Sequence, residues 1–485
     1  MTTITGYAIL AIFSSLLLRL LRAILLPPSS FPKGIPVVPI WVSTLGFVTR
    51  MGQDEIYKDY IAPRMRKEGV VAIWFGGRWS LLTGSVDMAG EVYTRTDDFV
   101  KSGNNEKIPH SVLAYFLGEN IISARGENWR RFRGILAPGF RTHWRPSMFK
   151  NCVRDLCRII DAQSYDHVRV NNLVQRLAMD CIGHAAFGQG FQALENPNAP
   201  ISVAHTILKK SIFKPLYLFF PILDALPIKS RQEARDKIDA MEQLLRGAAK
   251  MLDDAHEDQN CNRGPPLIQR LTVAHRNGVL TDEDFRNNLM VIFVAGHENV
   301  QQGLTSLLYL LAKHPDIQRK ARQEVHAKVV SLSELTDSTH LPPFSYLTKV
   351  IKEALRMYPP IPMLINRRTL RPTLLGGKFW IPESTYVGWH AFGVHRDAKH
   401  WEDPERFDPE RFSDVSMDRF AWVPFAEGGR KCLGMKLALT VMHTITAAIL
   451  FRYEIFLDPN IQVKMTPGGL LTPVDLRLEF KLYNT

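Results

Sequence analysis

The chain has 485 residues, of which 46% are apolar and 22% are charged, and its formal net charge is +12. This length and composition exclude a disordered or collagen-like chain and fit a single enzyme with one large core. The positive charge suits an acidic partner or an anionic membrane surface, whereas nucleic acid is not expected as a partner because the basic residues are dispersed.

The N-terminal segment has the length and hydropathy of a membrane span. Residues 7–26 are apolar except for two serines and two arginines, and about 20 such residues cross the hydrocarbon core. Basic residues follow the segment and none precedes it, which places the body of the protein in the cytosol. A cleaved signal peptide is the alternative, although no small-residue cleavage site follows. We expect a membrane anchor over residues 1–27, a proline-rich connector over 28–40 and the main domain over 41–485.

A small sheet is predicted at the start of the main domain. Residues 70–75 and 80–83 are short apolar runs on either side of Gly76 and Gly77, as in two strands joined by a turn. Residues 101–120 are polar and predict an irregular segment. A second hairpin is expected at residues 376–382, where Gly376 and Gly377 supply the turn.

Helical patterns dominate the middle of the chain. Trp129 and Arg133 are four positions apart and share a helical face. Residues 212–228 are unusually apolar and aromatic, and either plain core or a membrane-dipping lid explains them. Thr281, followed by three acidic residues, predicts a helix start. The apolar spacing beyond it predicts a long central helix.

Two charged segments lie in the C-terminal third. Glu353 and Arg356 are three positions apart and form a pair on one helical face. The sequence Pro-Glu-Arg-Phe then occurs twice, at residues 404–407 and 409–412, and offers Arg406 and Arg411 as further partners. Between these segments lies His395, for which a structural role is expected.

The most specific stretch contains Phe425, Gly428, Arg430, Cys432 and Gly434. A thiolate framed by glycines and an arginine is typical of an axial ligand of heme iron. The glycines would permit tight turns with positive φ and a close approach to a porphyrin. The chain's cysteines lack paired spacing, so a reducing compartment is expected. The other four are expected to be small buried hydrophobic residues: Cys152, Cys157, Cys181 and Cys261.

This spacing resembles the ligand loop of the cytochrome P450 family. Other family-like segments occur in the family's order, at residues 129–133, 295–299, 353–356 and 408–412. The resemblance covers about residues 30–480 and implies the cytochrome P450 fold, mainly α with a smaller β-rich part. The anchor and connector resemble those of microsomal members, which lie on the endoplasmic reticulum membrane with the catalytic domain in the cytosol.

The resemblance implies heme b, with Cys432 as the axial ligand of the iron. Arg430, Trp129, Arg133 and Arg367 would bind the heme propionates, with Arg368 as an alternative to Arg367. The complete set of cofactor-binding residues implied by the resemblance is Cys432, Arg430, Trp129, Arg133, Arg367, Phe425 and Gly434. A structural triad would consist of Glu353, Arg356 and Arg411, with Arg406 as an alternative third member.

Residues 295–299 resemble the segment that lies next to bound dioxygen in this family, and they differ from it only at Asn299. Ala295 and Gly296 would leave room for dioxygen, and Glu298 would relay protons. Asn299 stands where the family usually has threonine, and an amide cannot pass a proton on as a hydroxyl can. Residues 295–301 also resemble a fungal branch of the family that contains tyrosine-dimerising and peptide-tailoring enzymes.

The implied activity is a monooxygenase reaction that uses dioxygen and electrons from NADPH, delivered by NADPH-cytochrome P450 reductase. A small apolar or aromatic metabolite of secondary metabolism is the expected substrate. The alternatives are oxidative coupling or desaturation of an amino-acid-derived substrate, and a reductase-independent isomerase or lyase. By the family order, the substrate would lie near these residues: Ile108, Val112, Tyr115, Phe116, 360–365 and 468–472.

Overall fold

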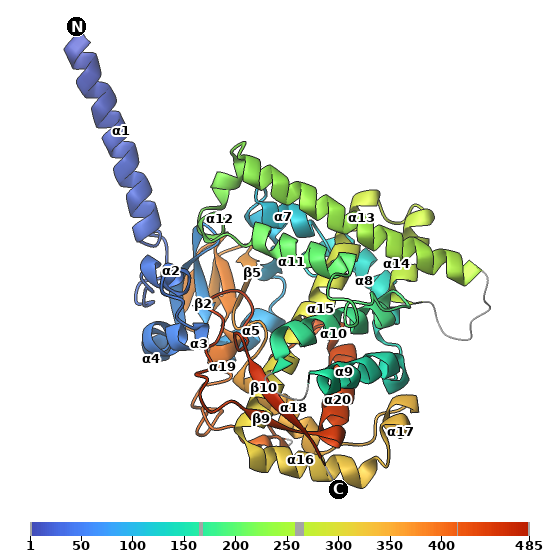
Figure 1. Ribbon diagram of the computed structural model, residues 1–485. Helices are drawn as coiled ribbons and strands as arrows, with labels where there is room; N and C mark the ends of the chain where they lie inside the picture. Colours follow the sequence, from blue (N-terminus) through green and yellow to red (C-terminus); the bar gives the residue numbers. More distant parts are fainter. Residues whose placement is uncertain (1, 164–167, 258–265, 415, 484–485) are drawn as a thin grey trace.

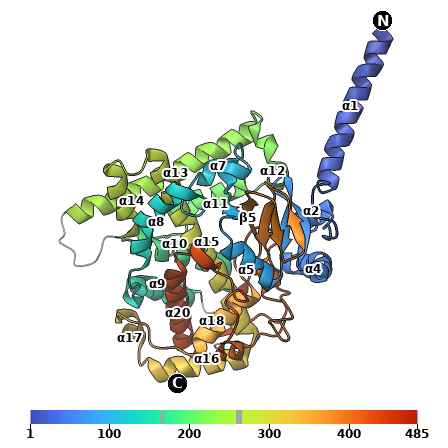
Figure 2. The same cartoon turned by 180° about the vertical axis from the view of Figure 1, so that it is seen from behind.

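The computed structural model describes residues 2–163, 168–257, 266–414 and 416–483. A helix-rich part and a smaller sheet-rich part pack side by side, as both views show (Figure 1, Figure 2). This arrangement confirms the predicted fold class. Cys261 lies outside the described residues, whereas Cys152, Cys157 and Cys181 are buried as expected.

The N-terminal helix α1 (Thr2–Leu25) projects from the body (Figure 1). Large apolar side chains along it are exposed, among them Phe13 and Leu18. The connector that follows is partly tied to the sheet, because Val38 donates its N–H to the carbonyl of Ala72 over 2.9 Å. Among the described residues, the helix long and apolar enough to cross a membrane is α20 (Met435–Arg452), but more than half of it is buried inside the protein.

The main sheet has the strand order β1-β2-β8-β5-β3. The predicted strands at residues 70–75 and 80–83 are confirmed as β1 (Val70–Phe75) and β2 (Arg78–Thr83). The predicted hairpin is confirmed as β6 (Thr373–Leu375) and β7 (Phe379–Ile381), with positive φ at both glycines of the turn. The remaining strands are β3 (Phe99–Lys101), β4 (Val168–Arg169), β5 (Leu364–Thr369), β8 (Tyr386–Trp389), β9 (Tyr453–Leu457) and β10 (Arg477–Leu482).

Residues 101–120 are not irregular, so that prediction was wrong. They contain α6 (Asn104–Lys107) and α7 (Val112–Leu117). The side chain of Ser111 caps α7 by accepting from the N–H of Ala114. Val112 and Phe116 are buried, so tertiary packing stabilises a helix too short to form alone.

The predicted central helix is confirmed as α15 (Asp282–Lys313). Thr281 and Asp284 form a capping box at its start. Helices α10 (Val170–Ala186), α14 (Leu267–Arg276), α18 (Tyr346–Met357) and α20 pack against it. Other long helices complete the body: α8 (Gly126–Phe140), α9 (Lys150–Ala162), α11 (Pro200–Ile212), α13 (Lys229–Glu257) and α16 (Pro315–Lys328).

Candidate functional site

The Cys432 loop is closed by its own backbone, because the N–H of Cys432 donates to the carbonyl of Phe425 over 2.9 Å. Gly428 has φ +75, and a Cβ there would lie 2.9 Å from the carbonyl oxygen of Tyr93. Gly434 differs from expectation, because its φ is −81 and a Cβ would meet protein atoms only at ordinary contact distance. Backbone strain therefore requires glycine at position 428 but not at 434.

The thiol of Cys432 lies at the N-terminus of α20. The residue is exposed, but many protein atoms surround the sulfur. These atoms desolvate the thiol and raise its pKa. The backbone N–H groups of Gly434 and Met435 oppose this rise by hydrogen bonding to the sulfur. Oriented N–H groups at a helix start favour an anion, although burial outweighs them for the thiol of Cys432.

A group of buried and half-buried cations lies near this loop. Arg430 places its Cζ atom 4.0 Å from the centre of the Trp129 ring, and Arg133 lies 5.2 Å from the same ring. Lys101 on β3 pairs directly with Arg367 on β5 in antiparallel register. Like charges in that position repel each other across a sheet. Both side chains are almost fully buried.

The pKa values of these cations show that the group lacks a counter-charge. Burial and the neighbouring Arg367 and Arg133 lower the pKa of Arg430 to about 9. Burial lowers the pKa of Arg367 to about 10. The pKa of Lys101 is also well below its usual range, through burial and the charges of Arg367 and Arg430. Within the described residues, no carboxylate lies within 4.0 Å of any of these cations.

Two buried nitrogens in this group, Arg430 Nη1 and Arg367 Nε, have no hydrogen-bond partner among the described residues. A buried unpaired cation is costly and calls for an anion. The two propionate carboxylates of heme fit this requirement. The sequence did not point to Lys101, because only the pairing of β3 with β5 places it opposite Arg367. Nε of Arg368 is also unpartnered, but its side chain is less buried.

Glu353, Arg356 and Arg411 lie together, where α18 contacts the turn at residues 409–413. Arg356 Nε is 2.6 Å from Glu353 Oε2, and both side chains are fully buried. Arg411 Nε lies 3.3 Å from Glu353 Oε1. Arg406 contributes only its backbone carbonyl, which accepts from Arg356 over 3.2 Å. The geometry therefore favours Arg411 over Arg406 as the third member.

On α15, Gly296 is explained by helix packing. A Cβ at this position would lie 2.5 Å from Cδ1 of Ile182 on α10. Asn299 donates its Nδ2 to the carbonyl of Ala295, one turn earlier, over 3.2 Å. Its Oδ1 is buried and has no partner among the described residues. Asn299 therefore offers an unpaired acceptor where a threonine would offer a hydroxyl.

The side chain of Glu298 does not join Asn299 and instead contacts α11. His205 Nε2 and Lys209 Nζ each lie 3.1 Å from Glu298 Oε1. Burial by itself would raise the pKa of Glu298, but the hydrogen bond from His205 and the charge of Lys209 outweigh it and lower the pKa to about 2. Glu298 is therefore ionised at neutral pH. No sequence pattern pointed to His205 or Lys209, because both come from a different helix.

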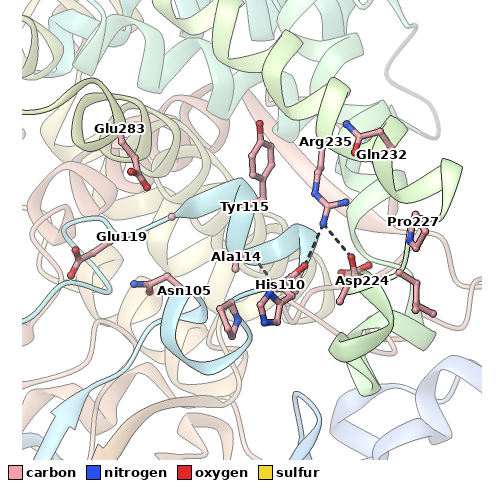
Figure 3. Close-up of a pocket in the computed structure, with 15 residues that line it drawn as sticks. Asn105, His110, Ala114, Tyr115, Glu119, Asp224, Pro227, Gln232, Arg235 and Glu283 are labelled. Atoms are coloured by element: carbon pink, nitrogen blue, oxygen red, sulfur yellow. Dashed lines mark hydrogen bonds between the residues drawn. The ribbon is translucent and has the colours of Figure 1, made fainter.

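The predicted substrate-side residues separate into two groups. Tyr115 faces outward and donates to Asp239 over 2.7 Å. It lines an outer cavity of about 760 Å³ between α7 and the segment around Asp224 and Arg235 (Figure 3). Val112 and Phe116 instead point into the core. The two other segments expected near the substrate, residues 360–365 and 468–472, contact each other. Leu471 donates its N–H to the carbonyl of Pro360 over 2.9 Å.

A helical body around α15, with a cysteine loop beside a cationic cradle, has the organisation of a heme-thiolate enzyme. The sequence profile of cytochrome P450 matches residues 32–480, and the chain belongs to this family of monooxygenases. It is 36% identical over 475 residues to cytochrome P450-DIT2 of Saccharomyces cerevisiae, covering 94% of this chain and 95% of the relative. It is 33% identical over 456 residues to cytochrome P450 monooxygenase xanG of Aspergillus fumigatus, with 89% and 84% covered. Cytochrome P450 3A9 of Rattus norvegicus is 30% identical, over 74% of each chain.

Proposed function

We propose that this protein oxidises a small apolar or aromatic metabolite of secondary metabolism, using dioxygen and electrons that a flavin reductase delivers from NADPH. The observation that carries the proposal is the buried, unpaired cation group beside Cys432. An anionic ligand would offset the cost of burying these charges. Heme supplies that anion through its propionates, and it supplies the chemistry of dioxygen activation and one-electron oxidation when bound.

The roles of the proximal residues follow from their positions. Cys432 would bind the iron as a thiolate, and the N–H groups of Gly434 and Met435 at the start of α20 would hydrogen-bond to its sulfur. Arg430, Arg367 and Lys101 would bind the propionates, with Trp129 and Arg133 completing the cradle. Phe425 would shield the sulfur. The Glu353 triad would fix the segment that carries this loop, because a buried bidentate pair is rigid.

The distal residues would control protons. Glu298 lies 3.1 Å from both His205 Nε2 and Lys209 Nζ, and the Lys209 side chain is partly exposed, so these three groups would form a path for protons from solvent. Ala295 would leave space for dioxygen, whereas Gly296 faces Ile182 on α10. The unpaired Oδ1 of Asn299 would accept a hydrogen bond from the substrate or from a water molecule, and so hold that molecule in place.

A second candidate function is oxidative coupling or desaturation without oxygen insertion. The observation in its favour is Asn299, whose amide is bonded to Ala295 and has no hydroxyl proton to transfer. In this reaction the substrate would lose two hydrogen atoms, and these, with two electrons from the reductase and two protons from solvent, would reduce dioxygen to two molecules of water. The substrate in this case would carry a phenol or a similar oxidisable group.

We also propose attachment to the endoplasmic reticulum membrane through residues 1–27. Helix α2 (Ile40–Thr49) and helix α12 (Pro215–Phe219) lie next to each other, with the rings of Phe47 and Phe219 5.6 Å apart. Trp41, Val48 and Leu216 are exposed on these helices. Helix α1 also exposes apolar side chains, and exposed apolar side chains of this kind suit contact with a bilayer. The exposed apolar side chains favour a membrane-dipping lid, rather than part of the plain core, for residues 212–228.

The test is product analysis under isotopically labelled dioxygen, with membranes, NADPH and reductase, on a panel of aromatic amino-acid-derived compounds. Label in the product supports oxygen insertion. Unlabelled products of doubled mass, or of mass lower by two hydrogens, support coupling or desaturation. Turnover that persists without NADPH and reductase would instead show an isomerase or lyase and would contradict both candidates.

A further inference from the structure

We propose that His205, His297 and Glu298 form a binding site for a divalent transition metal of the zinc type, between α11 and α15. One ligand atom from each residue lies within 4.8 Å of the others. The helices that carry them are adjacent in both views (Figure 1, Figure 2). The site is distinct from the Cys432 loop and uses none of its residues.

The separations of the ligand atoms fit a small metal ion. His205 Nε2 lies 3.2 Å from His297 Nε2 and 3.1 Å from Glu298 Oε1. Tetrahedral zinc with bonds of about 2.0–2.1 Å keeps its ligands about 3.3 Å apart. Two imidazole nitrogens and one carboxylate oxygen are a ligand set that zinc accepts. The third separation, between the ligand atoms of His297 and Glu298, is at most 4.8 Å, so these two side chains would rotate toward each other around one ion.

Both imidazoles have an outer partner on the nitrogen that faces away from the site. His297 Nδ1 donates to the carbonyl of Phe293 over 2.7 Å, which leaves the lone pair of Nε2 free. His205 Nδ1 lies 2.9 Å from the side-chain amide of Gln175. Metal-binding histidines characteristically have such partners, which fix the tautomer and the ring orientation.

Metal binding requires one change of tautomer. With Gln175 Nε2 donating to His205 Nδ1, the proton of His205 is on Nε2, where Glu298 and His297 both accept it. When the metal binds, this proton moves to Nδ1 and the Gln175 amide rotates so that its oxygen accepts. No proton leaves the protein, and the lone pair of Nε2 is then free for the metal.

Lys209 is the internal competitor of the metal. Its Nζ lies 3.1 Å from Glu298 Oε1, and its side chain is 40% exposed, whereas that of Glu298 is 11% exposed. The ammonium group can therefore move into solvent as the metal enters. Since two cations repel each other at this distance, loss of Lys209 should tighten metal binding by about tenfold.

The experiment uses the full chain, loaded with heme, free of any histidine tag and kept in detergent micelles. Equilibrium dialysis against zinc, followed by metal analysis, should give one tightly bound equivalent. X-ray absorption at the zinc edge should show nitrogen and oxygen ligands at about 2.0–2.1 Å, and sulfur at about 2.3 Å would overturn the assignment. The variants His205→Ala and His297→Ala should each bind this zinc at least about tenfold more weakly.

Two further variants distinguish loss of this zinc site from misfolding and from zinc binding at the protein surface. Lys209→Met should bind zinc more tightly, a gain that misfolding cannot produce. His143 and His340 form an exposed ring pair, 4.6 Å between centroids, and are the rival site. His143→Ala should leave the tight equivalent unchanged. Zinc binding that survives both His205→Ala and His297→Ala, or that is lost in His143→Ala, would overturn the proposal.

Bound zinc should also slow turnover, because it occupies the carboxylate of Glu298. This consequence rests on the proposed function, whereas zinc binding itself does not. Tight zinc binding with full turnover would therefore contradict the relay role of Glu298 and leave the metal site intact.

Discussion

His395 accepts the backbone N–H of Val423 at its Nε2 atom over 2.9 Å, and its other ring nitrogen must therefore carry the proton. That nitrogen, Nδ1, donates to the carbonyl of Arg356 over 3.0 Å. Burial lowers the pKa of the ring well below its usual range, so the ring is neutral. The imidazole thus joins the end of α18 to the segment that leads into the Cys432 loop.

Replacing His395 by leucine should destabilise the holoprotein by about 1–3 kcal/mol, because two buried backbone groups lose their partner. The measurement is thermal unfolding, followed by circular dichroism and by loss of heme absorption. His110→Ala, at an exposed position, is the matched control and should have little effect. Equal stability of His395→Leu and wild type would contradict the joining role.

The triad gives a sharper comparison between two arginines. Arg411→Ala should cost about 1–3 kcal/mol, because it removes a charged hydrogen bond to buried Glu353. Arg406→Ala should change stability by no more than about 0.5 kcal/mol, since the exposed side chain is not used and the backbone carbonyl remains. Chemical denaturation of both variants checks this. A larger loss for Arg406→Ala would reverse the assignment of the third member.

Lys101→Met should have opposite effects on the two forms of the protein. Without heme, the variant should be more stable than wild type, because Lys101 and Arg367 repel each other across the sheet. With heme, affinity should fall by roughly 10-fold, equivalent to about 1.4 kcal/mol for a charged hydrogen bond. Thermal shifts of the heme-free protein and heme transfer to an acceptor protein measure the two effects. Arg130→Ala, exposed on α8, should change neither.

Cys432→Ser should abolish thiolate ligation, because a serine hydroxyl is not ionised near neutral pH. The readout is the absorption band of the ferrous carbon monoxide complex, which should move away from the position typical of thiolate ligation. Cys152→Ser, at a buried cysteine outside the loop, should keep the band. Retention of the band in Cys432→Ser would refute the assignment of the ligand.

The sequence was sufficient where a signal is local. Strand β1, the turn at Gly76 and Gly77 and the capping box of α15 depend on neighbouring residues, and all appear as expected. It was insufficient where distant segments meet. Lys101 faces Arg367 only through strand pairing, and His205 reaches Glu298 only because α11 packs on α15. Gly296 seemed to make room for dioxygen, yet its contact with Ile182 on α10 already excludes a side chain.

Asn299 is the position that separates the two candidate functions. Asn299→Thr restores a hydroxyl that can donate and pass on a proton, so the fraction of product that contains labelled oxygen should rise. Asn299→Ala removes the amide without adding a hydroxyl and separates loss of the Oδ1 acceptor from gain of a proton donor. If coupling is the natural reaction, wild type and Asn299→Ala should give mostly unlabelled product, and only Asn299→Thr should shift toward insertion. The same label fraction in all three proteins would show that residue 299 does not set the outcome, and the choice between coupling and insertion would then rest on how the substrate is held.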